Sequence, residues 1–456
     1  MINTNDFGAK INRLLSDAAN VSPGELNAIL EKSARFEGLT PEEVAALLVA
    51  DNVEYTSRIL DIAGEIKAHI YGNRIVLFAP LYVSDYCVNS CSYCGFKADN
   101  TRPRRKLTQD EIRDEVAVLE KMGHKRLVIE TGEDPENSPI DYVLECINAV
   151  YDMKFENGEI RRVNVNVAAM DVEDYRRLKD AQIGTYILFQ ETYHRPTYEK
   201  VHISGPKRDF DYHLAAFDRA MEAGIDDVGA GVLFGLYDYK YEVLALMLHN
   251  QHLEEKYGVG FHTISVPRIC DAGADESYPF AVNDNDFLRL VAILRMAVPF
   301  TGMIVSTREE PDMRRKLVKA GISQMSAGSR TQVGGYSESN NNDKNAQFAL
   351  SDHRQASEIF YWLIEEGVLP SFCTACYRRG RSGSHFMKLA KAGDIKNVCI
   401  PNGLLTLKEY ALDYGDSHFQ ALADKLIAEN LENIGNKESI QSKLAFLNQG
   451  GRDVFI

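Results

Sequence analysis

Eight short apolar runs alternate with amphipathic segments between residues 74 and 327, and this alternation constrains the fold more than any other feature. The runs are 74–80, 126–130, 162–167, 184–190, 227–234, 260–266, 302–307 and 321–327. Segments such as 107–123 separate them and repeat apolar residues at helical spacing. Strands that alternate with helices in this way predict an α/β fold, a (βα)8 barrel of the TIM type. An open doubly wound sheet permits the same alternation, but eight regular units favour the closed barrel.

Helical patterns flank the predicted barrel on both sides. Residues 1–72 place apolar side chains at three- and four-residue steps, which predicts an N-terminal helical extension. A polar tract at 334–347 predicts a loop after the last strand. We therefore expect three regions: the extension over 1–72, the barrel over 73–345, and a small, mainly helical region over 346–456.

Composition excludes several classes of protein. The chain has 456 residues, of which 45% are hydrophobic, and a net charge of −15, so it contains enough apolar residues for a globular core. The acidic excess argues against nucleic acid or an anionic membrane as a partner, because both attract clustered Lys and Arg. No apolar run approaches the ~20 residues of a membrane helix, and the first residues lack the apolar segment of a signal peptide. We expect a cytoplasmic protein.

Three of the eight cysteines lie together directly after the first predicted strand. Cys87, Cys91 and Cys94 stand in the loop YCVNSCSYCGF, separated by three residues and then by two. Three thiolates can hold three irons of a 4Fe–4S cluster and leave the fourth iron open for a small molecule. Structural zinc is the alternative, but it normally has four protein ligands, and no fourth ligand is evident nearby.

This loop resembles that of the radical S-adenosylmethionine (SAM) superfamily. Tyr93 directly precedes the last cysteine and Phe96 follows shortly after it, as in that family. The resemblance implies that the open iron binds the amino and carboxylate groups of SAM. It also implies that one-electron reduction cleaves SAM to a 5′-deoxyadenosyl radical, and that a SAM pocket lies at the carboxyl ends of the barrel strands.

Candidate SAM-binding residues follow four of the predicted strands. Glu133, in Thr131-Gly132-Glu133, resembles the acid of the family's Gly-Gly-Glu turn, from which Thr131 departs. By the same resemblance Glu191 meets ribose or the methionyl amine, and Arg195 pairs with the methionyl carboxylate. The remaining candidates are Tyr93, Phe96, Asn164 and Asn166, and, for close approach of adenine, Gly229, Gly231 and Gly235. Each alone could equally be a strand-end turn or a solvated cap.

A second group of cysteines lies in the C-terminal region. Cys373 and Cys376 are separated by two residues, and Cys399 follows after a further 22. The run Arg-Arg-Gly-Arg at 378–381 places positive charge beside the pair, which would stabilise a thiolate-bound cluster. A zinc knuckle and unliganded core cysteines are the alternatives. Cys146 and Cys270 stand alone in the sequence and are interpreted as bystanders.

A radical SAM barrel that ends in CTACYRRGR, with a third cysteine further on, resembles the HydG family of [FeFe]-hydrogenase maturases from about residue 75 to residue 400. The related 2-iminoacetate synthases of thiamine biosynthesis share the barrel but lack the second cysteine group. The resemblance implies cleavage of the Cα–Cβ bond of L-tyrosine to p-cresol and dehydroglycine. Dehydroglycine then yields CO and cyanide on an auxiliary iron–sulfur cluster, and an iron–carbonyl–cyanide synthon is released.

The same resemblance assigns further residues and partners. His262 would help to hold a labile fifth iron of the auxiliary cluster together with L-cysteine, although a lone strand histidine is more often a core group. Arg308 would bind the substrate carboxylate, with Arg330 as the alternative, and Ser306 and Ser326 would meet the substrate amine. A surface salt bridge from Arg308 to Glu309 or Glu310 remains open. The implied partners are a one-electron reductant of the flavodoxin or ferredoxin type and other hydrogenase maturation proteins.

Two other functions stay open from the sequence. The chain could be a radical SAM amino-acid lyase of the 2-iminoacetate synthase type or with another substrate, in which the second cluster has a different role. It could also be an iron–sulfur scaffold or carrier, although SAM-pocket candidates on several strands argue against this.

Overall fold

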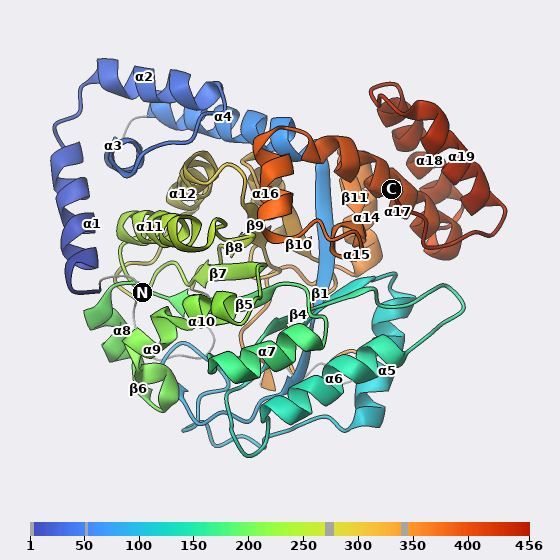
Figure 1. Cartoon of the computed structure of the whole chain (residues 1–456), viewed down its shortest axis with the longest axis horizontal. Helices are drawn as coiled ribbons and strands as arrows, with labels where there is room; N and C mark the ends of the chain where they lie inside the picture. Colours follow the sequence, from blue (N-terminus) through green and yellow to red (C-terminus); the bar gives the residue numbers. More distant parts are fainter. Residues whose placement is uncertain (1–3, 51–52, 270–277, 339–344) are drawn as a thin grey trace.

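The predicted closed barrel is present in the computed structural model, which describes residues 4–50, 53–269, 278–338 and 345–456. Eight parallel strands follow one another around the barrel, and the last pairs with the first (Figure 1). They are β1 (Arg74–Ser84), β3 (Arg126–Thr131), β4 (Arg162–Asn166), β5 (Tyr186–Glu191), β7 (Val228–Val232), β8 (Thr263–Ser265), β9 (Gly302–Val305) and β10 (Gln324–Ser326). Each predicted run overlaps one of these strands, and the (βα)8 prediction is confirmed.

Helices surround the strands on the outside of the barrel. They are α5 (Gln109–Lys121), α6 (Ile140–Asp152), α7 (Val172–Asp180), α8 (Arg195–Val201), α9 (Phe210–Leu214), α10 (Ala216–Glu222), α11 (Tyr239–Tyr257), α12 (Asp284–Ala297) and α13 (Pro311–Lys319). Helix α5 shows how such a helix begins. The Thr108 side chain accepts from the Glu111 amide, and Glu111 accepts from the Thr108 amide at 2.7 Å. This capping box satisfies amides that the first turn leaves unpaired.

The N-terminal residues form four helices, as the sequence predicts. These are α1 (Thr4–Ala18), α2 (Pro23–Ala34), α3 (Pro41–Val49) and α4 (Val53–Tyr71). Helices α1 and α3 pack on α11, and α4 packs on α12 (Figure 1). At the end of α4 the Tyr71 hydroxyl donates to the Phe300 carbonyl at 2.5 Å. The extension therefore lies against the outer helices, and its last residue reaches the amino-terminal end of the barrel.

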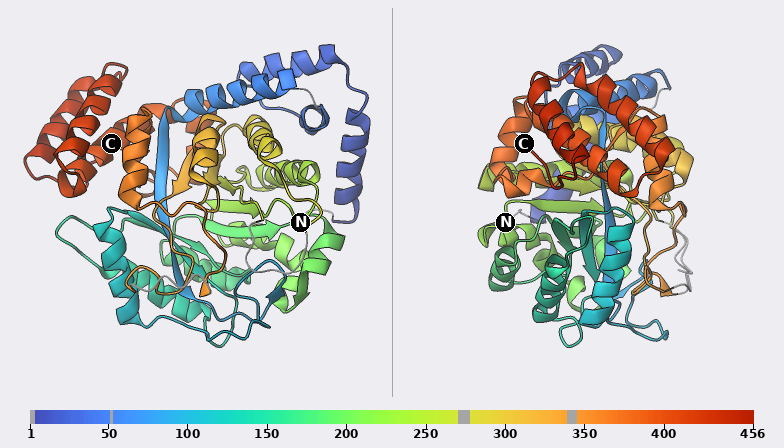
Figure 2. Two further views of the ribbon diagram at one scale, coloured as in Figure 1. Left: turned by 180° about the vertical axis from the view of Figure 1, so that it is seen from behind. Right: turned by 90° about the vertical axis from the view of Figure 1, so that its right-hand side faces the viewer.

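The C-terminal region is mainly helical but also adds a strand that the sequence analysis did not predict. Its helices are α14 (Ala356–Glu365), α15 (Ala375–Arg378), α16 (Gly383–Lys391), α17 (Ile395–Tyr414), α18 (Ser417–Leu431) and α19 (Lys437–Asn448). Strand β11 (Leu369–Ser371) pairs in parallel with β1, outside the ring of eight. Helices α17, α18 and α19 stand together at one side of the molecule (Figure 2).

A small antiparallel ribbon fastens the first cysteine loop. Strand β2 (Ser90–Cys91) pairs with β6 (His202–Ser204), which follows α8. The Ser92 amide donates to the Val201 carbonyl at 2.9 Å, next to this ribbon. The loop is thereby held to the chain that leaves β5. Among the helices of the described residues, none combines the length and apolarity needed to cross a membrane.

Candidate functional site

Two cavities lie at opposite ends of the barrel interior. The upper cavity lies at the carboxyl ends of the strands, where (βα)8 enzymes place their active sites. Its polar lining includes Tyr82, Asn89, Cys91, Cys94, Glu130, Glu133, Asn166, Glu191, Lys207, His213, Ser306, Arg308 and Ser326. The lower cavity lies at the amino ends, and its lining includes Arg74, Arg126, Asp227, His262, Cys373, Cys376, Tyr377, Arg381 and Cys399. Both predicted cysteine groups thus border a cavity.

The first cysteine loop presents free thiols to the upper cavity. Cys91 and Cys94 line it, and Cys87 lies beside it, with its sulfur 3.8 Å from the Asn89 amide nitrogen. The Phe96 amide donates to the Cys94 sulfur at 3.4 Å. Burial raises the pKa of the Cys94 thiol to about 11. Neutral thiols are therefore favoured until a metal replaces their protons, and the amide donor favours a sulfur that carries negative charge.

An ion pair lies in the upper cavity next to this loop. The Lys207 ammonium donates to Glu191 at 2.8 Å, and its backbone amide donates to the Asn89 side chain at 2.9 Å. Burial opposes the charge of Lys207, but neighbouring negative charge, that of Glu191 first, outweighs it and raises the pKa of Lys207. Glu191 adopts a left-handed backbone with φ of 66°, at the irregular end of β5. Such a conformation is costly for a non-glycine residue and is typical of functional sites.

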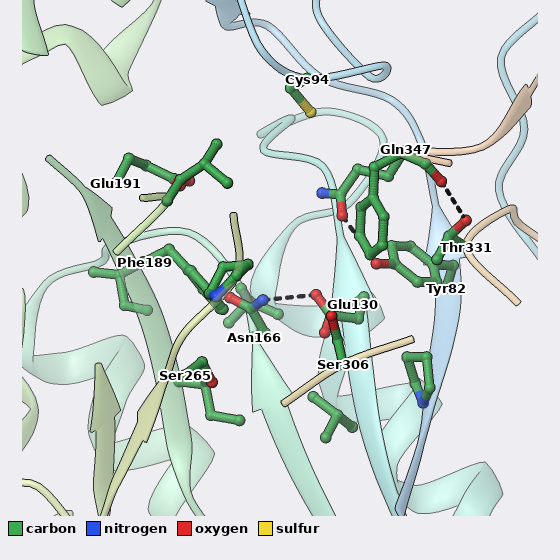
Figure 3. A pocket seen from close by; sticks show the side chains of 18 of the residues that line it. Tyr82, Cys94, Glu130, Asn166, Phe189, Glu191, Ser265, Ser306, Thr331 and Gln347 are labelled. Atoms are coloured by element: carbon green, nitrogen blue, oxygen red, sulfur yellow. Dashed lines mark hydrogen bonds between the residues drawn. The ribbon is translucent and has the colours of Figure 1, made fainter. Parts of the chain in front are cut away.

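Two further carboxyl groups, of Glu130 and Glu133, line the upper cavity. Glu133 accepts a hydrogen bond from Asn89 at 2.6 Å, and burial raises its pKa. Glu130 accepts from Asn166 at 2.7 Å, as Figure 3 shows, and burial raises its pKa to about 8. On the neighbouring strand β1, Tyr82 is the register partner of Glu130, and its hydroxyl donates to Gln347 at 2.9 Å. The sequence analysis identified Glu133 and Asn166 but missed Glu130.

The lower cavity gathers the second cysteine group and His262. The hydrogen bond between Cys376 and Cys399, and the charge of Arg74, lower the pKa of Cys399. The Ala375 amide donates to the Cys373 sulfur at 3.4 Å. His262 lies with its Nδ1 3.7 Å from an Asp227 oxygen, and burial lowers its pKa. The cavity therefore combines thiols with positive charge, as a site for an anionic thiolate cluster needs.

Three arginines that contribute to this positive charge were not predicted from the sequence. Arg74 and Arg126 are the first residues of β1 and β3, and both line the lower cavity. Arg162, the first residue of β4, lies 3.7 Å from the centre of the Tyr377 ring, which lines the same cavity. An arginine that opens three neighbouring strands was the signal, because parallel strands begin at the same end of a barrel.

Neither cysteine group has the arrangement of a site for a single metal ion. Within the described residues, no set of three or more His, Cys, Asp or Glu side chains is placed to hold one ion. In a 4Fe–4S cluster each thiolate binds a different iron. This observation therefore argues against a single-ion site such as structural zinc, but not against an iron–sulfur cluster.

Comparisons with known proteins agree with this geometry. The radical SAM superfamily model matches residues 81–248, and the biotin and thiamin synthesis associated domain matches 265–369. A 2-iminoacetate synthase of Escherichia coli is 29% identical over 76% of this chain and 90% of its own length. A crystal structure of HydG, a maturase of the [FeFe]-hydrogenase, matches with a TM-score of 0.95 and 53% identity over 99% of this chain and 100% of that one. The chain belongs to the HydG family. The HydG structure from Carboxydothermus hydrogenoformans also matches, with a TM-score of 0.85 and 37% identity over 98% of this chain and 99% of that one.

Membership of a radical SAM family implies a 4Fe–4S cluster and SAM as cofactors of this HydG-family chain. The upper cavity fits both groups. It offers free thiols with an amide donor to sulfur, beside a ring of carboxyl, amide and ammonium groups for a polar ligand.

Most of the predicted upper-site residues come together in the HydG-family barrel. Those that line the upper cavity are Cys91, Tyr93, Cys94, Glu133, Asn166, Glu191, Ser306, Arg308 and Ser326. Phe96 is buried beside the cysteine loop, with its ring edge-on to Tyr82. Asn164 is also buried, and its side chain accepts from the Thr185 amide at 3.0 Å. Both support the cavity from behind.

Several other predicted residues lie elsewhere. Arg195, the first residue of α8, pairs with Asp211 and lies over the Phe210 ring, so it does not line the upper cavity. Arg330 donates to the Ser329 carbonyl at 3.2 Å, and it is also absent from the lining of that cavity. Both residues lie near the upper cavity along the chain, since Glu191 and Ser329 line it, but neither arginine does.

The predicted glycines of β7 lie directly against side chains of the neighbouring strands. A Cβ on Gly231 would lie 2.3 Å from the Phe189 ring, and one on Gly229 would lie 2.5 Å from the Thr263 hydroxyl. These glycines make room for side chains of their register partners on β5 and β8, and neither lines the upper cavity. Gly235 lies beyond the strand with φ of 111°, a conformation that favours glycine.

Of the two cysteines that stand alone in the sequence, one lies within the described residues. Cys146 is a free, buried thiol on α6, outside both cavities, and stays a bystander. Cys270 lies outside the described residues.

Gly132 lets β3 approach the first cysteine loop. A Cβ on Gly132 would lie 2.3 Å from the Tyr86 carbonyl and 3.0 Å from the Cys87 Cβ. We expect Gly132→Ala to displace the loop and to lower cluster retention at the first site by about 10-fold, the range for disturbed supports of metal ligands. The measurement is the cluster EPR signal per chain after anaerobic reconstitution, in a Cys373→Ser/Cys376→Ser background that leaves one site. Gly38→Ala is the control, because nothing lies within 4 Å of a Cβ there; equal signals in both variants would contradict the prediction.

Proposed function

We propose that this chain is a radical SAM tyrosine lyase that cleaves the Cα–Cβ bond of L-tyrosine to p-cresol and dehydroglycine. We propose further that dehydroglycine is converted to CO and cyanide at the second cysteine group. The observation that carries the proposal is the pair of cysteine groups at opposite ends of one barrel. The likeness to HydG, a maturase of the [FeFe]-hydrogenase, and to 2-iminoacetate synthase supports it.

The upper cavity would hold the cluster and SAM. When bound there, they supply a 5′-deoxyadenosyl radical that abstracts a hydrogen atom from the amino group of tyrosine. Cys87, Cys91 and Cys94 would hold three irons. Glu133 and the Glu191–Lys207 pair lie next to these thiols and would meet the polar groups of SAM.

The substrate would lie deeper in the upper cavity, where Arg308 is the carboxylate clamp. Its guanidinium lies over the Phe348 ring at 3.5 Å, and Glu309 accepts instead from Arg268 at 2.9 Å. A planar guanidinium binds a carboxylate with two parallel hydrogen bonds, which fixes the amino acid firmly. Within the described residues the buried Ser326 hydroxyl has no hydrogen-bond partner, so it is available to the substrate amine together with Ser306.

The interior of the barrel offers a short route from one site to the other. Val76 lines the lower cavity, and Phe78, the next residue of β1 on the same face, lines the upper one. Gln324 and Ser326 of β10 are divided in the same way. Residues two apart in a strand point to the same face, so one layer of side chains separates the cavities. We propose that dehydroglycine passes through this layer.

The lower site would hold the auxiliary cluster. Cys373, Cys376 and Cys399 would bind it, His262 and L-cysteine would hold the labile iron, and the cluster when bound supplies the iron that takes up CO and cyanide. Arg74, Arg126 and Arg381 surround the site with positive charge. The product would be an iron–carbonyl–cyanide synthon for the hydrogenase, passed to other maturation proteins, and a flavodoxin- or ferredoxin-type reductant would supply electrons.

A division of labour among the three predicted regions is part of this proposal. We propose that 73–345 is the lyase barrel, that 346–456 binds the auxiliary cluster, and that 1–72 is a helical brace on the barrel's outer helices.

The test is a product assay under anaerobic conditions. We would reconstitute the protein with iron and sulfide, add SAM, dithionite, L-cysteine and L-tyrosine, and measure p-cresol and CO together. Both products are expected from the parent protein, and Cys94→Ala should form neither. Formation of p-cresol without CO would indicate a 2-iminoacetate synthase-type lyase. SAM cleavage without p-cresol would mean another substrate, and no SAM cleavage would favour a scaffold or carrier.

A further inference from the structure

Glu130 differs from the other acids of the upper cavity in its position and in its hydrogen-bond partner. It is the residue before the last of β3, and its carboxyl group faces the cavity beside Ser306 (Figure 3). Glu133 is held by Asn89, and Glu191 is held by Lys207, both next to the cysteine loop. Glu130 accepts from Asn166 through one oxygen, Oε2, and lies toward the part of the cavity that contains Ser306 and Arg308.

The proposed reaction needs a base in that part of the cavity. The amino group of a free amino acid is an ammonium ion near neutral pH, and it carries no lone pair. Loss of a hydrogen atom from ammonium would leave a radical cation that no lone pair stabilises. A proton must therefore leave the substrate nitrogen before a hydrogen atom is abstracted from it, and a group on the protein must accept that proton.

The other titratable groups that line the cavity are less suited to accept it. The phenol of Tyr82 donates to Gln347, and burial raises its pKa well above the usual value. His213 uses Nε2 on the Phe189 carbonyl at 2.9 Å, and burial lowers its pKa to about 3. Arg308 is a cation and would hold the carboxylate. The remaining acids lie next to the cysteine loop, with their partners already described.

We propose that Glu130 is the general base that deprotonates the substrate ammonium. The Glu130 carboxylate and the R–NH3⁺ group become a carboxylic acid and R–NH2, and no electron is exchanged. Asn166 donates to Oε2 throughout, which fixes the carboxyl group and leaves Oε1 to take the proton. This inference rests on the proposed tyrosine lyase function.

The electrostatics of the position suit this role. Burial raises the pKa of Glu130 to about 8, against the opposing effects of the Asn166 hydrogen bond and the Arg308 charge. A base whose pKa lies near the working pH combines a useful ionised fraction with enough affinity for the proton. Tyr82 on β1 and Arg308 after β9 are the titratable or charged groups that interact with it from neighbouring elements.

The experiment compares Glu130→Gln with Glu130→Asp and the parent protein. Glutamine keeps the shape and an acceptor for Asn166 but cannot take a proton, whereas aspartate keeps the base at shorter reach. The rates of p-cresol and 5′-deoxyadenosine formation are measured with saturating tyrosine between about pH 6 and pH 9.5. Circular dichroism and cluster EPR verify that the variants fold and hold their clusters.

We expect Glu130→Gln to lower kcat for p-cresol by about 10²–10⁴-fold near neutral pH, with KM for tyrosine nearly unchanged. Its rate should rise tenfold per pH unit, because only substrate that arrives as the free amine reacts. The rate of the parent protein should level off above the pKa of the Glu130 carboxyl group. Glu130→Asp should be faster than Glu130→Gln, and its rate should depend on pH as that of the parent does. SAM cleavage without tyrosine should be the same in all three proteins.

A parent-like rate and pH profile in Glu130→Gln would overturn the inference alone. A uniform loss at every pH, with a raised KM, would show that Glu130 positions the substrate and is not the base. If the parent protein forms no p-cresol from tyrosine, the proposed function fails first, and the inference falls with it.

Discussion

Replacing Cys373 and Cys376 together by serine is expected to leave p-cresol formation near the parent rate and to reduce CO to background. The variant removes two of the three thiols of the lower cavity, and a serine hydroxyl does not replace a thiolate as a soft ligand for iron. The upper cavity, with Cys91, Cys94 and Arg308, shares no lining residue with the lower one. Loss of the lower cluster should therefore affect only the step assigned to it. The measurement is p-cresol and CO in the same anaerobic reaction.

Cys146→Ala is the matched control for that variant. It removes a free, buried thiol on α6 that lines neither cavity, so both products should persist. CO from the double variant at the parent rate would show that the second cysteine group is not where CO forms. Loss of both products, with cluster EPR still present for the upper site, would show that the two halves of the reaction are not separable.

Lys207→Met is expected to lower the free energy of unfolding by about 3–5 kcal/mol, the range for breaking a buried ion pair. The Lys207 and Glu191 side chains are only 19% and 10% exposed, so solvent screens the pair weakly. Methionine has a similar length but leaves the Glu191 carboxylate without its cation. The same loss should remove most SAM cleavage, because Glu191 and Lys207 lie beside the cysteine loop. Anaerobic urea unfolding and 5′-deoxyadenosine formation measure the two effects.

Two other lysine variants make the Lys207 result interpretable. Lys207→Arg keeps the positive charge and should stay within about 1–2 kcal/mol of the parent protein. Lys200→Met makes the same chemical change at an exposed residue of α8 and should change stability by no more than about 0.5 kcal/mol. Equal losses for Lys207→Met and Lys200→Met would mean that the buried pair contributes nothing.

Periodicity was enough to predict the barrel but not the strand added outside it. Each of the eight predicted runs carries several apolar residues, and helical patterns separate the runs, so the alternation is visible in the sequence. Strand β11 has three residues, one of which is Pro370, and proline argues against a strand interior. It is tolerated because β11 lies at the edge of the sheet, beside β1 alone. That edge position depends on tertiary packing, which local patterns do not encode.

Position along a strand likewise predicted part of the site. It brought Glu133, Asn166 and Glu191 correctly to the upper cavity, because parallel strands end together. The same reasoning did not predict that Arg195 lies outside the upper cavity. Arg195 begins a helix, and a position after a strand does not determine the direction of a side chain on the helix that follows. Lys207 was missed because it comes from a different segment, after β6, and reaches Glu191 only in the folded chain.

Strand β1 has a further consequence through its length of 11 residues. Its Val76 pairs with Ser371, two residues before Cys373, and its last residue, Ser84, lies three residues before Cys87. Val76 and Ser84 are about 26 Å apart at the usual rise of an extended strand. One continuous, hydrogen-bonded strand therefore sets the distance between the two cysteine groups. If the two groups hold clusters as proposed, an intermediate made at one of them has to diffuse across this fixed distance to reach the other.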